Sequence, residues 1–278
     1  MVSLPGGVTV AQNALMRNQP RQARLYLIQN FLRLQFTTPC PLCGLAARGG
    51  DFCRACLGEV TAARRACLTC AICADELPSA LAAPRSLSSS RILCEGCAKN
   101  PPAFESSIVA MRYAFPTDAL MHELKKRMQL HLAALMGRML AGAIREEPHT
   151  LAKLACIVPI PSSDVSIRRR GFNPPGEIAR VLAKALGLPC QVSWLRRTQA
   201  GGVQKHLDQQ ARRLATEHAY ESRPNLPAVW IGLVDDVMTT GSTMHFAALA
   251  LRRGGAAGVV ALSAMRTPRL VWHNTQHV

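Results

Sequence analysis

Aromatic residues, acidic residues and long apolar runs are all scarce in this chain of 278 residues. Aromatic residues make up 5% of the sequence and do not alternate with the basic runs, so no base-stacking platform for nucleic acid is visible. No uninterrupted apolar stretch is long enough to cross a bilayer. The first residues also lack the charged-then-apolar order of a secretory signal. We therefore expect a cytoplasmic protein without membrane insertion.

The shortage of acidic residues leaves a strongly basic chain. Lys and Arg number 33 against 17 Asp and Glu, which gives a formal net charge of +16 at pH 7. Such a charge favours nucleic acids, phosphorylated metabolites or anionic membrane surfaces without choosing between them. The length allows one medium domain with a smaller appendage. Residues 25–36 suit a short basic amphipathic helix, which we expect to pack on that domain as part of a lead-in over residues 1–35.

Nine of the eleven cysteines lie between Cys40 and Cys97. In a reducing compartment they are not expected to form disulfides. Eight of them form four Cys-x-x-Cys turns: Cys40/Cys43, Cys53/Cys56, Cys70/Cys73 and Cys94/Cys97. One turn presents two thiolates to a metal ion, and two turns complete a tetrahedral all-cysteine zinc site. The four turns therefore predict two structural Zn²⁺ sites in a loop-rich module over residues 36–105.

The spacing leaves the pairing of the four turns open. Sequence order gives the simplest arrangement, in which the first turn joins the second and the third joins the fourth, but an interleaved arrangement satisfies the same spacing. Cys67 extends the third turn to Cys-x-x-Cys-x-x-Cys, which leaves open which two of the three thiols are ligands. The alternative to zinc is redox chemistry or an iron–sulfur centre, and four matched turns favour structural zinc. Residues 78–90 suit a flexible loop inside the second half of this module.

From residue 106 onward, strand and helix patterns alternate, which predicts an α/β domain over residues 106–278. Apolar runs predict strands at 107–113, 155–160, 191–195, 229–234 and 258–265. Helical spacing predicts helices at 117–147, 174–186 and 245–253. This alternation implies a parallel sheet with right-handed crossovers and ligands at the carboxyl ends of the strands. The basic residues of the 117–147 helix, Lys125 among them, favour a solvated face over a docking surface.

The most specific segment of the chain is VWIGLVDDVMTTGST, residues 229–243. A buried strand is followed by Asp235 and Asp236, then by a loop of hydroxylated residues and Gly241, then by a helix. The free N–H groups and positive dipole end of the helix suit a phosphate, and glycine lets the backbone approach it closely. Two carboxylates can accept hydrogen bonds from a vicinal ribose diol. The order of these features favours a phosphoribosyl site over a solvated Asp-Asp turn that merely caps the next helix.

A second candidate for anion binding follows the strand at 155–160. Three arginines at 168–170 form a loop before Asn173, and the next helix begins at Pro174 or Pro175. Three consecutive arginines usually form a solvated surface. Their place between a buried strand and the start of a helix instead favours contact with an anion. Residues 198–213 then suit an excursion over the site or a mobile loop.

Taken in order, these motifs resemble those of the ComF family, whose members join a double zinc ribbon to a type I phosphoribosyltransferase domain. The resemblance covers about residues 38–266 and rests on the paired cysteine turns, PPAF, VPIP followed by RRRGFN, the spaced residues Gln204, Leu207 and Arg212, and VDDVMTTGST. It implies an α/β fold with a type I phosphoribosyltransferase-like parallel sheet flanked by helices. It also implies a cytoplasmic role in handling single-stranded DNA during natural competence, alongside a DNA-uptake helicase, or in nucleotide metabolism.

The resemblance further implies a site for phosphoribosyl pyrophosphate (PRPP) with Mg²⁺. Asp235 and Asp236 would hold the ribose hydroxyls as the catalytic candidates. The rest of the PRPP-binding set would be Val237, the phosphate loop Thr239, Thr240, Gly241, Ser242 and Thr243, and Arg168, Arg170 and Asn173 on the pyrophosphate side. The chain departs from the family motif at Pro174, where glutamine is usual. Two hypotheses follow: a transferase that displaces pyrophosphate from PRPP, and a non-catalytic zinc module that binds single-stranded DNA or a DNA-translocation partner.

Overall fold

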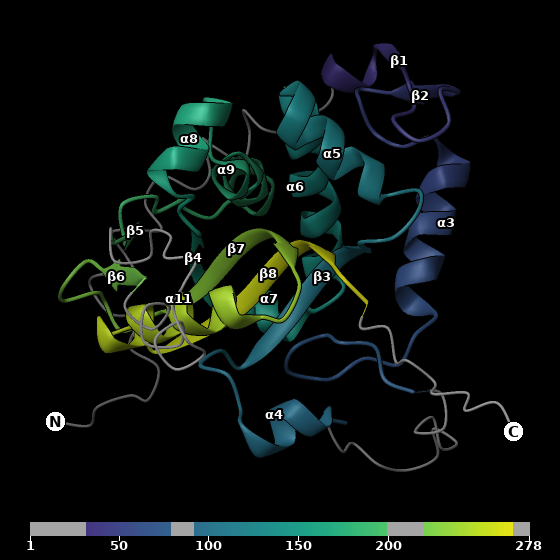
Figure 1. The fold of residues 1–278 in the computed structure, drawn as a ribbon. Coiled ribbons are helices and arrows are strands. Elements are labelled where there is room, and N and C mark those ends of the chain that lie inside the picture. The colour runs from purple at the N-terminus through teal and green to yellow at the C-terminus, as the bar shows by residue number, and fades with distance from the viewer. Residues whose placement is uncertain (1–31, 79–91, 199–218, 269–278) are drawn as a thin grey trace, which may run out of the picture.

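A four-stranded parallel sheet forms the centre of the computed structural model, which describes residues 32–78, 92–198 and 219–268 (Figure 1). Its strand order is β3-β8-β7-β4, and every neighbouring pair is parallel. The strands are β3 (Ser106–Arg112), β4 (Leu154–Pro159), β7 (Trp230–Met238) and β8 (Gly258–Arg266). All nine residues of β8 are buried, because this strand lies inside the sheet and helices cover both faces.

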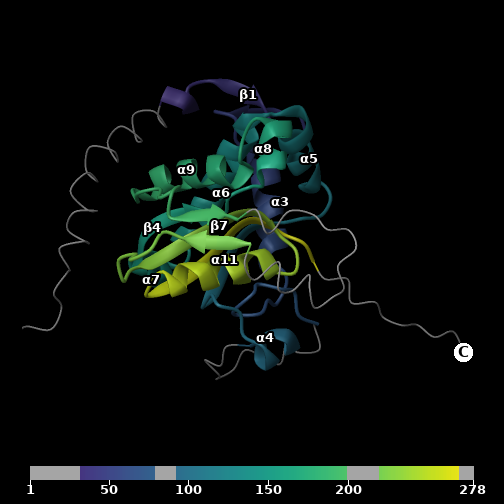
Figure 2. The ribbon, with the colours of Figure 1, turned by 60° about the vertical axis from the view of Figure 1, so that its left-hand side comes forward.

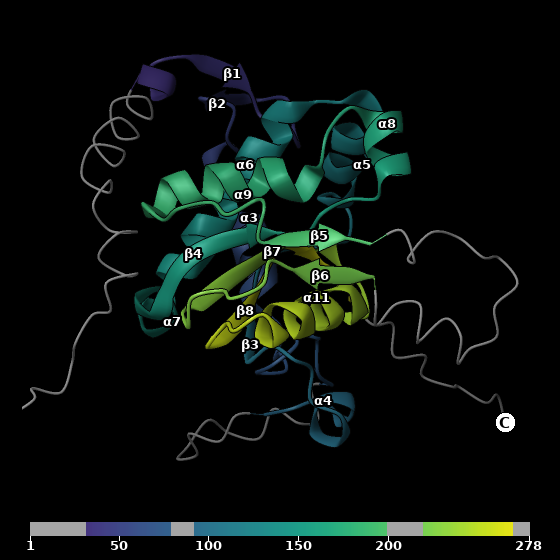
Figure 3. The same ribbon diagram turned by 90° about the vertical axis from the view of Figure 1, so that its left-hand side faces the viewer.

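Helices form a layer on each face of the sheet (Figures 2 and 3). One face carries α6 (Leu130–Arg145) and α9 (Pro174–Leu186), and the other carries α11 (Ser242–Arg253). Because side chains alternate along a strand, β8 contributes to both cores. Val260 and Leu262 pack in the core under α6 and α9, whereas Val259 and Ala261 pack in the core under α11. The predicted fold class, a parallel sheet flanked by helices behind a cysteine-rich N-terminal region, is confirmed.

The predicted helix at 117–147 and the predicted strand at 191–195 differ from the elements observed. The single helix predicted at 117–147 is two helices, α5 (Asp118–Arg127) and α6, because Met128 adopts a left-handed φ of 55° that ends α5. A further short helix, α7 (Pro148–Lys153), follows. The strand predicted at 191–195 is wrong. β5 (Leu195–Arg197) instead pairs with β6 (Tyr220–Ser222) in a separate antiparallel sheet.

The cysteine-rich region divides into two parts on opposite faces of the sheet. The first contains the hairpin β1 (Thr37–Pro39) and β2 (Ala46–Arg48), and it shares the core under α6 through residues such as Phe52. The second contains α4 (Glu95–Lys99) and shares the core under α11 through Phe104. Helix α3 (Arg54–Arg65) connects the two parts and packs against β3, one of the two edge strands of the central sheet (Figure 1). The region is therefore built into the α/β core on both sides.

Several predicted segments lie outside the described residues. They are residues 25–31 of the lead-in, the loop at 79–90, and residues 199–213 with Gln204, Leu207 and Arg212. Among the helices that the structure does describe, none combines the length and the apolar character needed to cross a bilayer.

Candidate functional site at the carboxyl edge of the sheet

The two adjacent aspartates lie within β7 and not after it, which corrects the predicted end of this strand at Val234. The strand continues to Met238 because β8 remains paired with it that far. Pairing with β4 ends earlier, where Val234 accepts a hydrogen bond from Ile160 N at 2.8 Å. Asp235 and Asp236 therefore lie where β7 extends beyond β4, and both are 8% exposed. This edge is where parallel sheets bind ligands.

Burial governs the electrostatics of the aspartate pair. Burial first, and then the charge of Asp236, raise the pKa of Asp235 well above its usual range. Each carboxylate accepts a hydrogen bond from the next backbone N–H, Asp236 N at 2.8 Å from Asp235 and Val237 N at 2.7 Å from Asp236. Asp236 Oδ2 also lies 2.7 Å from the ammonium of Lys125, in the last turn of α5. The interpretation of Lys125 as part of a solvated face is therefore wrong.

The loop after β7 presents hydroxyl groups to solvent at the start of a helix. Thr239, Thr240, Ser242 and Thr243 are exposed, and Gly241 has a left-handed φ of 83°. Helix α11 begins at Ser242, three residues earlier than predicted. Gly241 occupies the N-cap position, where it has no side chain to offer to the helix, and Thr240 Oγ1 accepts from Ser242 N at 3.3 Å. The first turn of α11 thus has N–H groups that an anion can contact.

The arginine run is helical, whereas a loop was predicted there. Helix α8 (Asp164–Arg170) is capped at its N-terminus by Ser163, whose Oγ accepts from Ser166 N at 3.2 Å. Because β4 and β7 are neighbours, α8 and the loop after β7 both leave the sheet at its carboxyl edge, on the right-hand side of Figure 3. Arg168 is exposed, whereas Arg170 is half-buried, and within the described residues its Nε has no hydrogen-bond partner.

The side-chain amide of Asn173 bonds to the backbone at this edge through both its oxygen and its nitrogen. Its Oδ1 accepts hydrogen bonds from Ser162 N at 3.2 Å and Ser162 Oγ at 2.6 Å. Its Nδ2 donates to Ile160 O at 3.0 Å. These bonds join the end of β4 to the start of α9. The predicted contacts of Asn173, Arg168 and Arg170 with a pyrophosphate group stay predictions.

Three further residues at this edge were not predicted as part of the site. Lys125 and Tyr220 come from elements far from the aspartates in sequence, and burial raises the pKa of Tyr220. Arg266 donates from Nη1 to Met238 O at 3.0 Å and to Thr239 O. Only Arg266 has a signal in the sequence, a charged residue that ends the apolar strand GVVALSAMR.

Eight of the cysteines form two groups of four. The first group is Cys40, Cys43, Cys53 and Cys56, the second is Cys70, Cys73, Cys94 and Cys97, and within each group all Sγ atoms lie within 4.8 Å of one another. The turns thus pair in sequence order, and Cys67 belongs to neither group. Sγ–Sγ distances of 3.6 Å between Cys43 and Cys53 and 3.7 Å between Cys73 and Cys94 match the roughly 3.8 Å expected around tetrahedral zinc with bonds of about 2.3 Å.

Backbone hydrogen bonds shape both cysteine groups for a metal ion. Cys53 Sγ accepts from Cys56 N at 3.5 Å where α3 begins, and Cys94 Sγ accepts from Cys97 N at 3.4 Å where α4 begins. Although burial opposes ionisation, hydrogen bonds from backbone groups lower the pKa of Cys40 to about 6. Donors of this kind stabilise the thiolates that zinc requires. Both groups therefore fit structural zinc.

Comparison with known proteins gives relatives named for competence and for DNA utilization. DNA utilization protein YhgH of Salmonella typhi is 29% identical over 181 residues, 63% of this chain and 78% of that protein. Competence protein F of Haemophilus influenzae is 28% identical over 167 residues, 58% of this chain and 73% of that protein. Competence protein ComFC of Bacillus subtilis is 34% identical over 113 residues, 40% of this chain and 44% of that protein. No protein-family model matches the chain.

Among solved structures, orotate phosphoribosyltransferase from Aeropyrum pernix matches 46% of this chain and 76% of its own. The sequence identity is 16% and the TM-score is 0.25. The fold assignment accordingly rests on the sheet topology and the cysteine groups described above.

Proposed function

We propose that the chain is a protein of the ComF family that binds PRPP or a related phosphoribosyl ligand and acts in DNA uptake or DNA utilization. The observation that carries the proposal is the buried Asp235–Asp236 pair, followed directly by an exposed hydroxyl and glycine loop at the start of α11. The curated relatives named for competence and DNA utilization support the cellular role.

In this proposal the aspartates bind the sugar and the loop binds its phosphate. The carboxylates of Asp235 and Asp236 accept hydrogen bonds from the two ribose hydroxyls. The 5-phosphate lies against the hydroxyls and N–H groups of residues 239–243, where the dipole of α11 is positive. Arg168 and Arg170, which follow the neighbouring strand, supply positive charge on the pyrophosphate side.

Mg²⁺ would accompany the pyrophosphate group of the ligand. This ion prefers oxygen ligands and keeps several waters, so the aspartate edge suits it and the thiol groups do not. When bound, it neutralises charge on the leaving pyrophosphate. Lys125 pairs with Asp236, and we expect this carboxylate to contact the sugar hydroxyls. If the site is catalytic, the contribution of these residues is to position the ribose and to stabilise the departing pyrophosphate electrostatically.

Calorimetric titration of PRPP with Mg²⁺ tests the proposal. We expect saturable binding to the wild type, and at least about a tenfold loss of affinity in Asp236→Asn and in the double variant Asp235→Asn/Asp236→Asn. Glu59→Gln, which removes one exposed carboxylate from α3, is the matched control and should bind as the wild type does. The absence of both heat and thermal stabilisation in the wild type would exclude the phosphoribosyl site.

A second function, binding of single-stranded DNA, is supported by charge. The net charge is +16, and exposed basic residues lie on two helices at the described edge: Lys126 and Arg127 end α5, and Arg168 and Arg169 lie on α8. Contacts with phosphates release counterions, so we expect oligonucleotide affinity to fall linearly with the logarithm of salt concentration. An oligonucleotide that fails to bind even at low salt would remove this function.

A further inference from the structure

The carboxyl ends of three neighbouring strands carry a row of residues in register. Arg112 of β3 is the Cα partner of Arg266 of β8, and Arg266 is in turn the partner of Met238 of β7. Two arginines therefore lie side by side at the end of the sheet. The proposed phosphate loop begins one residue after Met238, at Thr239.

Arg266 contacts the phosphate loop and the second cysteine group at the same time. It is only 4% exposed. On one side its Nη1 donates to Met238 O at 3.0 Å and to Thr239 O. On the other side its Nε donates to Cys73 O at 3.2 Å, and its Nη2 lies 3.4 Å from Asp75 Oδ1. The rigid guanidinium fork can hold both sides in one fixed geometry, which a single ammonium group cannot do.

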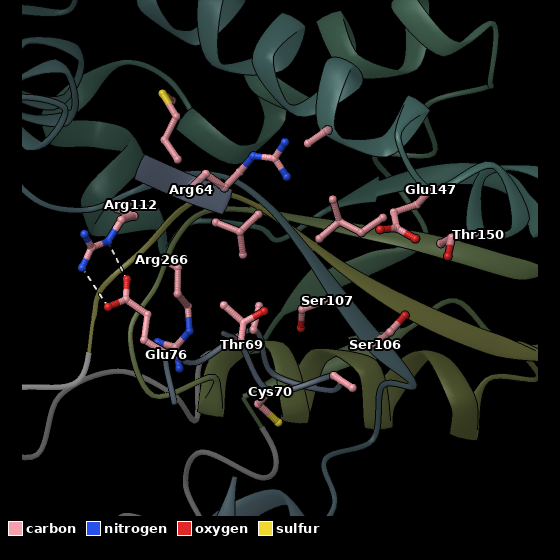
Figure 4. A pocket seen from close by; sticks show the side chains of 16 residues that line it. Arg64, Thr69, Cys70, Glu76, Ser106, Ser107, Arg112, Glu147, Thr150 and Arg266 are labelled. Carbon is pink, nitrogen blue, oxygen red and sulfur yellow. Dashed lines mark hydrogen bonds and ion pairs between the residues drawn. The ribbon is translucent and has the colours of Figure 1, made fainter. Parts of the chain in front are cut away.

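Arg112 also joins the same cysteine module to the sheet, and within the described residues its guanidinium bonds to the module and not to the loop. Its Nη2 donates to Glu76 Oε2 at 2.7 Å, and its Nε donates to Glu76 Oε1 at 2.5 Å. Glu76 follows Asp75 directly, so consecutive acidic residues of the module bind adjacent arginines of the sheet. Figure 4 shows both arginines beside a cavity of about 310 Å³ that Cys70 also lines.

The metal-binding turn itself sets the positions of the groups that Arg266 contacts. Ala74 N donates to Cys70 O at 2.9 Å, Cys70 N donates to Asp75 O at 2.8 Å, and Ala74 has a left-handed φ of 54°. This tight turn directs the Cys70 and Cys73 thiols to one ion, which would stabilise it against opening. If the ion leaves, the carbonyl of Cys73 and the carboxylate of Asp75 lose their fixed place.

We propose that Arg266 is a positioning residue through which the second cysteine group, with its metal bound, holds residues 239–243 in their ligand-binding shape. Only the identity of the loop's ligand rests on the proposed function. The connection between the second cysteine group and the loop rests on the contacts of Arg266. The first cysteine group is connected elsewhere, because Asp51 of its module pairs with Arg138 of α6 at 2.6 Å. The loop therefore depends on the second metal site and not on the first.

Hydrogen exchange of the backbone amides of residues 239–243 tests the connection in the full chain. Cys94→Ser removes a ligand from the second group, and Cys43→Ser is the matched change in the first. We expect Cys94→Ser to accelerate exchange in the loop by at least about tenfold, and Cys43→Ser to leave it within about twofold of the wild type. An unchanged loop in Cys94→Ser, or equal acceleration in both variants, would overturn the inference.

A second pair of variants isolates Arg266 from the metal. Arg266→Lys keeps a positive charge near Asp75 but cannot span both sides, so we expect faster exchange in the loop while zinc content stays at the wild-type level. Arg112→Lys weakens the connection of the same module to β3 and should leave loop exchange unchanged. Equal loop exchange in the two variants would contradict the role of Arg266. If this pattern holds but PRPP does not bind the wild type, the proposed function fails and the positioning role stands.

Discussion

The ammonium group of Lys125 lies 2.7 Å from Asp236 Oδ2 and joins the last turn of α5 to β7. Lys125 also opposes the rise in the pKa of Asp235 that burial and the neighbouring carboxylate cause. One cation therefore stabilises a pair of carboxylates that would otherwise repel each other inside the protein.

Replacing Lys125 should destabilise the protein measurably. Lys125→Met leaves Asp236 and Asp235 without their compensating charge, and because the lysine is partly exposed we expect a loss of about 1 kcal/mol in the free energy of unfolding. Urea unfolding measures this loss. Lys126→Met changes the exposed neighbour and should alter stability by less than about 0.5 kcal/mol. Equal losses in the two variants would show that the ion pair contributes nothing specific.

The raised pKa of Asp235 should make stability depend on pH. The folded state binds the proton of Asp235 more tightly than the unfolded state does, so this group favours folding at low pH. That contribution is lost as pH rises from about 4, the usual value for Asp, through the raised value in the folded protein. Asp235→Asn removes the effect. The unfolding free energy of wild type minus variant should therefore fall as the pH rises above about 4, and a flat or rising difference would contradict the assignment.

Zinc analysis should give two ions per chain with no role for Cys67. All four Sγ atoms of each group lie within 4.8 Å of one another, and Cys67 belongs to neither group. We expect Cys67→Ser to retain both ions, whereas Cys40→Ser and Cys97→Ser each weaken binding at one site. Mass-spectrometric metal analysis and competition with a chromogenic chelator measure these changes. Loss of an ion in Cys67→Ser would require a different set of ligands.

Features encoded by neighbouring residues could be predicted from the sequence, and long-range contacts could not. The Cys-x-x-Cys turns and the order of apolar run, Asp235–Asp236 and Gly241 are local patterns, so the cysteine groups and the ligand edge were found. The predicted end of β7 at Val234 is wrong because the pairing of β7 with β8 continues through the two aspartates. A charged residue at the end of an apolar strand marks Arg266, but the contacts of Arg266 and Lys125 depend on the folded sheet, and no local pattern indicates them. The break at Met128 was missed because apolar residues keep helical spacing on both sides of it.

The hydrogen bonds of Asn173 predict a loss of stability that needs no ligand. Asn173→Ala removes the acceptor of Ser162 N and Oγ and the donor to Ile160 O, so we expect a decrease of about 1–3 kcal/mol in the unfolding free energy of the free protein. Arg169→Ala, an exposed change nearby, should have an effect below about 0.5 kcal/mol. Urea unfolding without PRPP decides between two roles. If Asn173→Ala is as stable as the wild type, a direct contact of Asn173 with the ligand is favoured. If the variant shows the expected loss, this side chain holds the end of β4 against the start of α9.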